Sequence, residues 1–455
     1  MVSKSAQSGQ ESLQRSLHSK NCSVVTCATH DDHTPLPENT LKKLSQEARE
    51  MVPDRFKALE SYDFACRRLE LFPKFDFTEL ELGTILGKGQ FGVVTEIRGF
   101  NLFENHRSSL GNMQIKSNWE DRNFMSVHCT RRGSQGAALS SSSRYAIKML
   151  DQKHCAKEDE FFTGVLDMAI EAHFLAAMEH PHVLKLRGLS VDPYGSKNFF
   201  VVFDRLYGTL NERIEEWRFQ QHRITRGFKG LFKRQITKEK KRDLLITRLR
   251  AMRDLASAVM YLHHNHIIDR DLKPDNIGFD IRGDVKLFDF GLSTVADQSR
   301  PKPYLLTGMT GSIKYMAPEV YNCRPYDETC DIYSMGLIFW RILSLEPLFA
   351  HMNRNMIKNA VVDGGARPAL NSKWPGSLRD LITGMWHADA DFRPTAKRVL
   401  LVVRRELALI KEKQKLDEDR ASDSASNCSD NKQVLLTRKS TYNQRRFTSS
   451  RYLHV

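Results

Sequence analysis

Apolar residues in the middle of the chain form short strand-like runs first and longer helical patterns afterwards. The strand-like runs extend from about 75 to 94 and recur at 145–148, 183–189 and 198–203. A helix-like pattern covers 165–178, and longer helical patterns follow beyond 206. This order predicts the α+β class, with a small five-stranded lobe that carries one main helix and a larger, mainly helical lobe. The hinge between them is expected at Asp204-Arg205-Leu206.

The flanks of this region differ from it in pattern. Helical spacing predicts an N-terminal helical extension over 38–74, which Pro53 is expected to interrupt. The apolar positions of this extension are Leu41, Leu44, Ala48 and Met51. Residues 1–37 and 411–455 are polar and without periodicity, so we predict a disordered tail at the start and a disordered basic tail at the end.

Two insertions interrupt the pattern. Residues 101–143 separate two strands that should be hairpin neighbours, which is far longer than a usual hairpin loop, and a mobile surface excursion is expected. Residues 215–243 carry ten Lys or Arg against four acids, interleaved with aromatic residues. The aromatic residues are Trp217, Phe219, Phe228 and Phe232. Such a segment can bind a polyanion or a membrane surface, but an extended solvated loop with a few anchoring aromatics is the commoner outcome.

Composition adds limits on partners and compartment. The formal net charge of +14 favours acidic partners without choosing among phosphates, acidic proteins, nucleic acid and anionic membranes. The eight cysteines form no CxxC pair, which disfavours a metal site or a disulfide framework and favours a reducing compartment. The first residues lack the apolar stretch of a signal peptide, and no run approaches the ~20 apolar residues of a membrane span. We expect an intracellular, cytoplasmic protein, with a nuclear one as the alternative.

The run from Asp271 to Asn276, followed by Asp289-Phe290-Gly291, carries the chemistry that a phosphoryl transfer needs. A carboxylate at Asp271 can accept the proton of an incoming hydroxyl, and Lys273 can neutralise charge on the transferred group. Asn276 and Asp289 supply the oxygen ligands that magnesium prefers. The pattern therefore predicts one site that holds all four side chains.

A glycine-rich stretch lies upstream of this run. Gly87, Gly89 and Gly92 remove side chains where backbone would approach a triphosphate, and Phe91 could cap the phosphates. The stretch leads from one predicted strand to another and is followed by Val94, whereas the dinucleotide-binding pattern leads from a strand to a helix. A tight turn alone would also fit this spacing.

These motifs, in this order, resemble those of the eukaryotic-type protein kinase family over about 75–410, with 75–206 as the N-lobe and 207–410 as the C-lobe. The resemblance implies that Lys148, in Tyr145-Ala146-Ile147-Lys148, binds the α- and β-phosphates of ATP and pairs with Glu171. It further implies a nucleotide site and a divalent ion, magnesium (Mg2+) with manganese as the alternative. The residues implied for the nucleotide are Gly87, Gly89, Gly92, Val94, Ala146, Lys148, Asp204 and Leu206. Lys273 resembles the serine/threonine-specific subgroup, and the stretch 180–188 resembles the tyrosine-kinase-like group.

The resemblance assigns residues 289–319 to an activation loop. Ser312 aligns beside the catalytic Asp271, and Arg270 could receive a loop phosphate, so phosphorylation of Thr307 or Thr310 is expected to activate the enzyme. Two structural contacts are also implied. Asp331 should hold the catalytic loop, and Glu319 should pair with Arg393.

Three positions depart from the family pattern. Asp269 stands where the family has His or Tyr in an apolar column beneath Phe290, with Leu175 and Leu186 as its upper members. A carboxylate there needs a partner, or else the column shifts and activity falls. Gly278 replaces an apolar residue below adenine, which should weaken nucleotide binding by about 1–2 kcal/mol. Phe203, at the gatekeeper position, should close the rear pocket.

Two classes of function remain after this reading. The first is a serine/threonine kinase that transfers the γ-phosphate of ATP to protein hydroxyls, with dual specificity as a variant. The alternative is a pseudokinase scaffold or a nucleotide-binding module with weak or no catalysis, and only Asp269 and Gly278 support it. The retention of Lys148, Glu171 and Asp271 favours the kinase.

Overall fold

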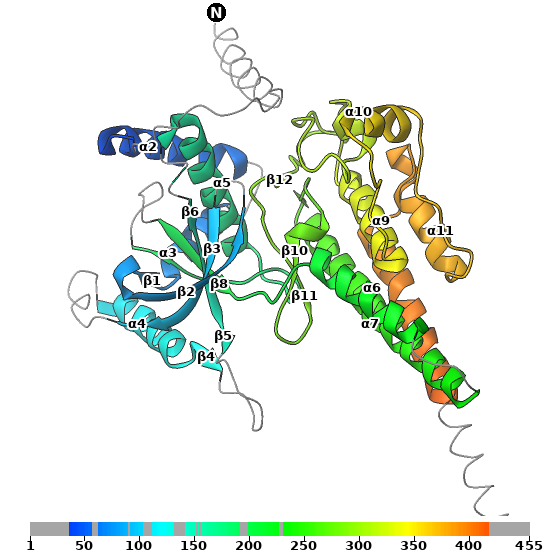
Figure 1. Cartoon of the computed structure of the whole chain (residues 1–455). Helices are drawn as coiled ribbons and strands as arrows, with labels where there is room; N and C mark the ends of the chain where they lie inside the picture. The colour runs from blue at the N-terminus through cyan, green and yellow to red at the C-terminus, as the bar shows by residue number, and fades with distance from the viewer. Residues whose placement is uncertain are drawn as a thin grey trace, which may run out of the picture.

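The structure is a computed structural model that describes residues 36–56, 62–89, 92–102, 112–131, 142–151, 153, 156–191, 199–226 and 231–417. A sheet with helices around it forms one lobe, and a mainly helical second lobe lies beside it (Figure 1). This arrangement confirms the predicted α+β class and its two lobes.

A six-stranded sheet in the order β1-β7-β8-β6-β3-β2 forms the small lobe. Its strands are β1 (Lys74–Phe75), β2 (Leu80–Lys88), β3 (Gly92–Phe100), β6 (Tyr145–Leu150), β7 (Leu186–Ser190) and β8 (Phe200–Asp204). Pairing is antiparallel except between β1 and β7. The expectation of five strands was therefore one short. Two residues are too few to show a strand period, and β1 is fixed instead by Phe75, which is fully buried with its ring 4.9 Å from that of Phe100.

One long helix, α5 (Glu158–Ala177), packs against the small lobe, and two helices of the N-terminal extension pack against it in turn. These are α2 (Glu38–Phe56) and α3 (Tyr62–Leu71) (Figure 1). The α2 face toward the core is a stripe at helical spacing: Leu41, Ser45, Ala48, Val52 and Phe56. Pro53 does not interrupt α2, contrary to expectation. Burial of Val52 and Phe56 on either side of it stabilises the last turn.

The long insertion between β3 and β6 contains a helix, α4 (Asn112–Val127), and a short hairpin of β4 (Thr130–Arg131) and β5 (Ser142–Ser143). Arg122 of α4 forms a buried ion pair with Glu79, and the hydroxyl of Ser126 donates to the carbonyl of Phe100 at 3.2 Å. The described part of this segment is thus docked on the sheet, not a surface excursion. The remainder of 101–143 lies outside the described residues.

The large lobe is built on α6 (Leu210–Arg226), α7 (Leu231–His264), α9 (Thr329–Ser344) and α11 (Gly376–Met385). Shorter helices of this lobe are α8 (Pro318–Tyr321), α10 (Arg354–Met356), the π-helix η5 (Ile357–Asp363) and the 3-10 turns η4 (Pro274–Asn276) and η6 (Ala390–Phe392). A further 3-10 turn, η1 (Phe77–Glu79), lies between β1 and β2 of the small lobe. Small sheets pair β10 (Ile277–Phe279) with β11 (Val285–Leu287), and β9 (Ile267–Ile268) with β12 (Thr294–Val295). Almost every residue of α9 is buried, which makes it the central helix of this lobe.

The basic segment 215–243 is mainly helical, because α6 and α7 run through it, and is not an extended loop. Trp217 is buried against Phe279, with ring centroids 6.3 Å apart, whereas Phe219 is exposed. Phe228 and the side chain of Phe232 lie outside the described residues.

A last helix over residues 396–417 packs beside α7 (Figure 1). It extends past the predicted boundary at 410, and Asp417 near its end accepts a hydrogen bond of 3.0 Å from Arg242. The predicted tails before residue 36 and after 417 lie outside the described residues.

Candidate active site

Lys148 lies in the centre of the small lobe's sheet and connects it to α5. Its register partners are Val94 on β3 and Val201 on β8. Its Nζ donates to Oε2 of Glu171 at 2.5 Å and lies 3.6 Å from Oδ1 of Asp289. Burial by itself lowers the pKa of Lys148, but the two carboxylates outweigh burial and hold that pKa above its usual value. The charged ammonium therefore ties α5 to the segment that begins at Asp289.

The carboxylate of Asp271 is held by three donors. Its Oδ2 accepts from Nζ of Lys273 at 2.6 Å and from Nδ2 of Asn276 at 3.2 Å. Its Oδ1 accepts from the backbone N–H of Ser312 at 2.8 Å. These bonds fix the carboxylate between the catalytic loop and the activation segment, where an oxygen with a lone pair to spare can receive a proton.

Asn276 and Asp289 stand at the same end of the β10–β11 hairpin. Asn276 precedes β10, and the backbone N–H of Phe288 donates to its carbonyl at 3.1 Å, one residue before Asp289. Amide and carboxylate oxygens are ligands that a hard divalent cation takes, and phosphates and water can complete its coordination. Within the described parts of the chain, no group of three or more His, Cys, Asp or Glu is placed to hold a metal without such help. The pair fits an ion brought with a nucleotide.

Asp331 on α9 holds the backbone of the catalytic loop. Its carboxylate accepts from the N–H groups of Asp269 and Arg270, each at 2.9 Å, and lies 3.0 Å from Nε2 of His263. Arg270 and Asp289 both have positive φ, at 70° and 68°. Such backbone costs of the order of 1–3 kcal/mol per residue, so these contacts hold the loop in a conformation it would not adopt alone.

Asp269 is buried, with 3% of its surface exposed, and is only half partnered. Its Oδ1 accepts from the backbone N–H of Asp271 at 3.0 Å, whereas Oδ2 has no hydrogen-bond partner among the described residues. Burial, followed by the nearby carboxylates of Asp331 and Asp271, raises the pKa of Asp269 well above its usual range. Phe290 remains fully buried in the core. One backbone donor therefore partners the carboxyl group beside the catalytic loop, and the raised pKa favours the neutral form of this group.

The glycine loop leaves room for backbone to approach a ligand. The N–H of Gly89 donates to the carbonyl of Gly92 at 2.8 Å, which closes the turn between β2 and β3. A Cβ on Gly92 would lie 3.2 Å from the carbonyl oxygen of Met149 and 3.4 Å from Cε of Lys148, whereas Gly87 faces open space. Phe91, expected at the tip, lies outside the described residues.

Leu206 occupies the space that the departure at Gly278 leaves empty. A Cβ built on Gly278 would lie 2.5 Å from Cδ1 of Leu206, so the hinge leucine already contacts that backbone. Val94 is half-buried and Ala146 is buried on the sheet side. The side chain of Leu206 therefore supplies an apolar surface beside Gly278.

Two ion pairs at the hinge were not predicted. The carboxylate of Asp204 accepts two hydrogen bonds from Arg187, at 2.7 and 2.8 Å. Because this side chain is engaged, only the backbone of Asp204 is left to contact a nucleotide. Arg205 donates to Oε1 of Glu96 on β3 at 2.6 Å, and the guanidinium lies over the ring of Tyr207. No local spacing signals a pair 109 residues apart.

The N-terminal extension supports the helix that carries Glu171. The ring of Phe56, at the end of α2, lies 4.6 Å from that of Phe174 on α5, which in turn lies 6.4 Å from Phe290. Phe56 also lies 5.6 Å from the ring of His173. An aromatic chain therefore runs from the extension to the residue after Asp289, although the sequence pattern predicted only that helices could pack here.

The activation segment is ordered against the catalytic loop. Gly311, with φ of 94°, lies so close to the carbonyl of Arg270 that no Cβ would fit. Arg270 Nη1 lies 3.5 Å from the hydroxyl of Tyr326, which donates to the carbonyl of Thr307 at 2.8 Å. The side chain of Thr307 is exposed, and the hydroxyl of Thr310 donates to the carbonyl of Thr307 at 2.9 Å.

Arg393 anchors the end of this segment. Its guanidinium is completely buried and contacts both carboxylate oxygens of Glu319, at 2.6 and 2.9 Å. It also donates to the carbonyls of His387 and Thr329, and lies over the ring of Tyr333.

Comparison with known proteins places this chain in a family. A sequence profile of the protein kinase domain matches residues 133–402, which is more than half of the chain. The chain therefore belongs to the protein kinase family, whose members use ATP and a divalent metal ion to modify protein substrates. The profile starts after the glycine loop, but β2 and β3 complete the same sheet.

Curated relatives include kinases of Arabidopsis thaliana and of Dictyostelium discoideum. Serine/threonine-protein kinase VIK of Arabidopsis thaliana is 38% identical over 39% of this chain and 42% of its own length. Serine/threonine-protein kinase STY46 of the same plant is 33% identical over 32% of this chain and 25% of its own length. Dual specificity protein kinase shkA of Dictyostelium discoideum is 34% identical over 34% of this chain and 30% of its own length. The matches thus span less than half of each of these relatives.

No helix in the described part of the chain is both long and apolar enough to cross a bilayer.

Proposed function

We propose that this chain is an active protein serine/threonine kinase, which transfers the γ-phosphate of ATP to hydroxyl groups of protein substrates. The observation that carries the proposal is the linked pair of clusters around Lys148 and Asp271. Lys148 contacts both Glu171 and Asp289, and Asp271 is held by Lys273 and Asn276. A pseudokinase would have no need to keep both of these sets of contacts.

In the proposed reaction, the substrate hydroxyl gives its proton to a carboxylate oxygen of Asp271 while its oxygen bonds to the γ-phosphorus. The bond from that phosphorus to the β,γ-bridging oxygen breaks, and ADP leaves with the electron pair. Lys273 lies 2.6 Å from Asp271 and can offset charge on the phosphoryl group as it moves. Lys148 orients the α- and β-phosphates while Glu171 keeps its ammonium in place.

We propose Asn276 and Asp289 as the residues that hold Mg2+, with Mn2+ as the alternative. When bound, the ion would supply positive charge that offsets the negative charge of the phosphates. The fit rests on the hard oxygen donors at the end of the β10–β11 hairpin. The remaining nucleotide contacts are assigned to Gly87, Gly89, Gly92, Val94, Ala146, Leu206 and the backbone of Asp204.

The test is phosphate transfer from labelled ATP to a generic basic protein, with Asp271→Asn as the matched variant. Asparagine keeps the shape but cannot act as a base, so transfer should fall by about a hundredfold or more while ATP still binds. Lys148→Met should weaken both. Transfer that persists in Asp271→Asn would refute the role of Asp271, and ATP binding without any transfer by the natural chain would support the pseudokinase.

We propose that phosphorylation of Thr307 or Thr310 regulates this activity. The support is the exposed side chain of Thr307 and the chain of contacts from its carbonyl through Tyr326 to Arg270. A phosphate of charge about −1.5 to −2 would draw Arg270 and stiffen the segment. Full activity of a Thr307→Ala/Thr310→Ala double variant would contradict this, and mapping of autophosphorylation sites would identify the residue.

We propose that the basic segment 215–243 binds an acidic partner or polyanion. Arg223, Lys238, Lys240 and Lys241 are exposed on α6 and α7, as is Phe219. Heparin binding that weakens with salt and with Lys240→Glu/Lys241→Glu would support this, whereas binding unaffected by salt would contradict it.

We propose a cytoplasmic location, with the nucleus as the alternative. The described cysteines Cys66, Cys129, Cys323 and Cys330 are free thiols, which suits a reducing compartment. Imaging of a fluorescent fusion would test the proposal, and an extracellular location would contradict it.

A further inference from the structure

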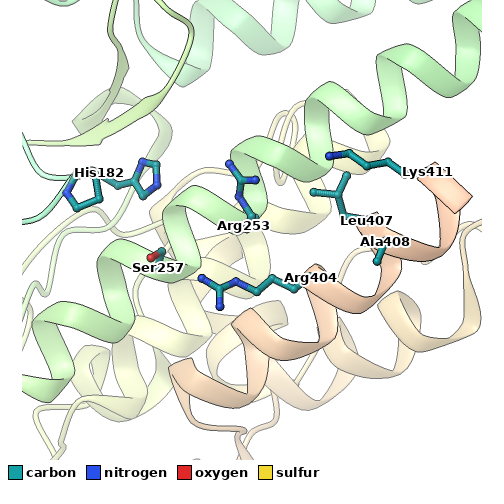
Figure 2. Close-up of a pocket in the computed structure, with 8 residues that line it drawn as sticks. His182, Arg253, Ser257, Arg404, Leu407, Ala408 and Lys411 are labelled. Atoms are coloured by element: carbon teal, nitrogen blue, oxygen red, sulfur yellow. The ribbon is translucent and has the colours of Figure 1, made fainter.

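A positively charged cavity lies between α7 and the helix over 396–417, beside the loop that follows α5 (Figure 2). Its volume is about 460 Å³, which lies within the range of small-molecule sites. Arg253 and Ser257 approach it from α7, and Arg404 and Lys411 approach it from the last helix (Figure 2). This cavity is separate from the Lys148 and Asp271 clusters.

The cavity has an excess of positive charge. Arg253 pairs with Asp254, which is 2% exposed and accepts from Nε of Arg253 at 2.8 Å and from Nη2 at 2.6 Å. His182 also approaches this carboxylate, with Nε2 at 3.5 Å. Arg404 and Lys411 have no hydrogen-bond or ion-pair partner among the described residues. Three cationic side chains therefore line the cavity, and Asp254 neutralises only Arg253, so Arg404 and Lys411 remain available to a ligand.

The other walls favour an organic anion over a bare ion. Leu407 and Ala408 line the cavity between the two free cations, so carbon as well as charge can be covered there. The hydroxyl of Ser257 adds a polar group, and it lies 3.3 Å from Nε2 of His180. A phosphoryl group suits this chemistry, because arginine and lysine donate several charge-assisted hydrogen bonds to its oxygens.

We propose that this cavity binds a phosphate monoester, with Arg404 and Lys411 as the residues that take the phosphoryl oxygens. The bound group would join the last helix to α7 and to the loop at His182. That loop leads directly from α5, whose Glu171 contacts Lys148. The ligand would thus stabilise the junction behind the active site without touching it.

The experiment is calorimetric titration of the whole chain, with the nucleotide site filled by a non-hydrolysable ATP analogue and magnesium. Two probes distinguish the sources of the phosphate: N-acetyl-phosphoserine amide for a phosphorylated protein, and inositol hexakisphosphate for a free metabolite. N-acetyl-serine amide and inositol are the matched uncharged controls. Inorganic phosphate alone shows how much of the affinity the carbon skeleton supplies.

The key variant is Arg404→Ala/Lys411→Ala, matched with Arg405→Ala/Lys413→Ala. Both pairs remove two charges from the same helix, but Arg405 and Lys413 do not line the cavity. We expect the first pair to weaken binding by about tenfold or more, as the loss of a charged hydrogen bond does. The second pair should change it by about twofold or less, through general charge alone. Arg404→Lys/Lys411→Arg should retain binding.

An equal loss in both alanine pairs would overturn the proposal, because the attraction would then come from the field of the whole helix. The proposal would also be overturned if neither probe bound to the natural chain at millimolar concentration. Circular dichroism would check that each variant folds, which we expect because the four substituted side chains are exposed. The readout is binding, so a failure here is distinct from any failure of phosphate transfer.

Discussion

Replacement of Asp269 by asparagine should stabilise this protein at neutral pH. Asparagine has the same shape, and its Oδ1 can still accept from the N–H of Asp271. What it removes is a carboxyl group that is buried without a partner for Oδ2 and that faces the carboxylates of Asp331 and Asp271. The natural protein must either hold that group neutral or bear an unpaired buried charge.

The sign of the effect follows from the raised pKa of Asp269. Its folded state holds a proton that the unfolded chain releases above the usual aspartate pKa of about 3.9. Stability therefore falls as pH rises from about 4 toward the raised folded pKa, by up to ~1.4 kcal/mol per pH unit, and then levels off. The Asp269→Asn variant lacks this loss. Its advantage should be near zero at about pH 4 and should grow with pH.

Guanidinium unfolding of both proteins at several pH values measures this difference directly. The two curves should meet at acid pH and separate above it. A difference that stays constant with pH would refute the reasoning, because it would show that Asp269 is as acidic in the folded protein as in the unfolded chain. Asp280→Asn is the matched control, because the hydrogen bonds and ion pairs of Asp280 lower its pKa despite partial burial and should give the opposite dependence.

Three further predictions concern packing around the site. Gly278→Leu should weaken ATP binding by displacing Leu206, and adding Leu206→Ala to this variant should restore part of the lost affinity. If calorimetry gave the same ATP affinity for Gly278→Leu as for the natural chain, the contact would be contradicted. Glu319→Gln should lower the free energy of unfolding by about 3–5 kcal/mol, because Arg393 is left buried without its counter-charge. Denaturant titration measures this, and a loss below about 1 kcal/mol, as for a surface pair, would contradict it. Phe56→Ala should lower the free energy of unfolding by about 3–5 kcal/mol and reduce phosphate transfer. Unchanged hydrogen exchange in α2 would show that the aromatic contact is unimportant.

The two-lobed fold could be predicted because its patterns are local. Short apolar runs before the hinge and helical spacing after it specify sheet and helix without any knowledge of contacts. The strand β1 could not be predicted in this way, because its two residues are placed by the burial of Phe75 and by pairing with a strand more than a hundred residues later. The helix α4 was missed because the length of its segment suggested a loop.

The candidate site followed the same division. Asp271, Lys273 and Asn276 are close in sequence, so their spacing predicted a common site, and the structure brings them together. The pair of Arg205 with Glu96 and the filling of the Gly278 space by Leu206 depend on distant strands that no local pattern relates.

The position of α2 changes where the catalytic unit begins. This helix covers α5 and also approaches β12, which lies in the activation segment. A recombinant fragment cut at residue 75 would uncover the apolar flank of α5 that Ala48, Val52 and Phe56 now shield from water. Such a fragment should be prone to self-association and reluctant to keep Glu171 beside Lys148, so biochemical work is best begun upstream of Glu38.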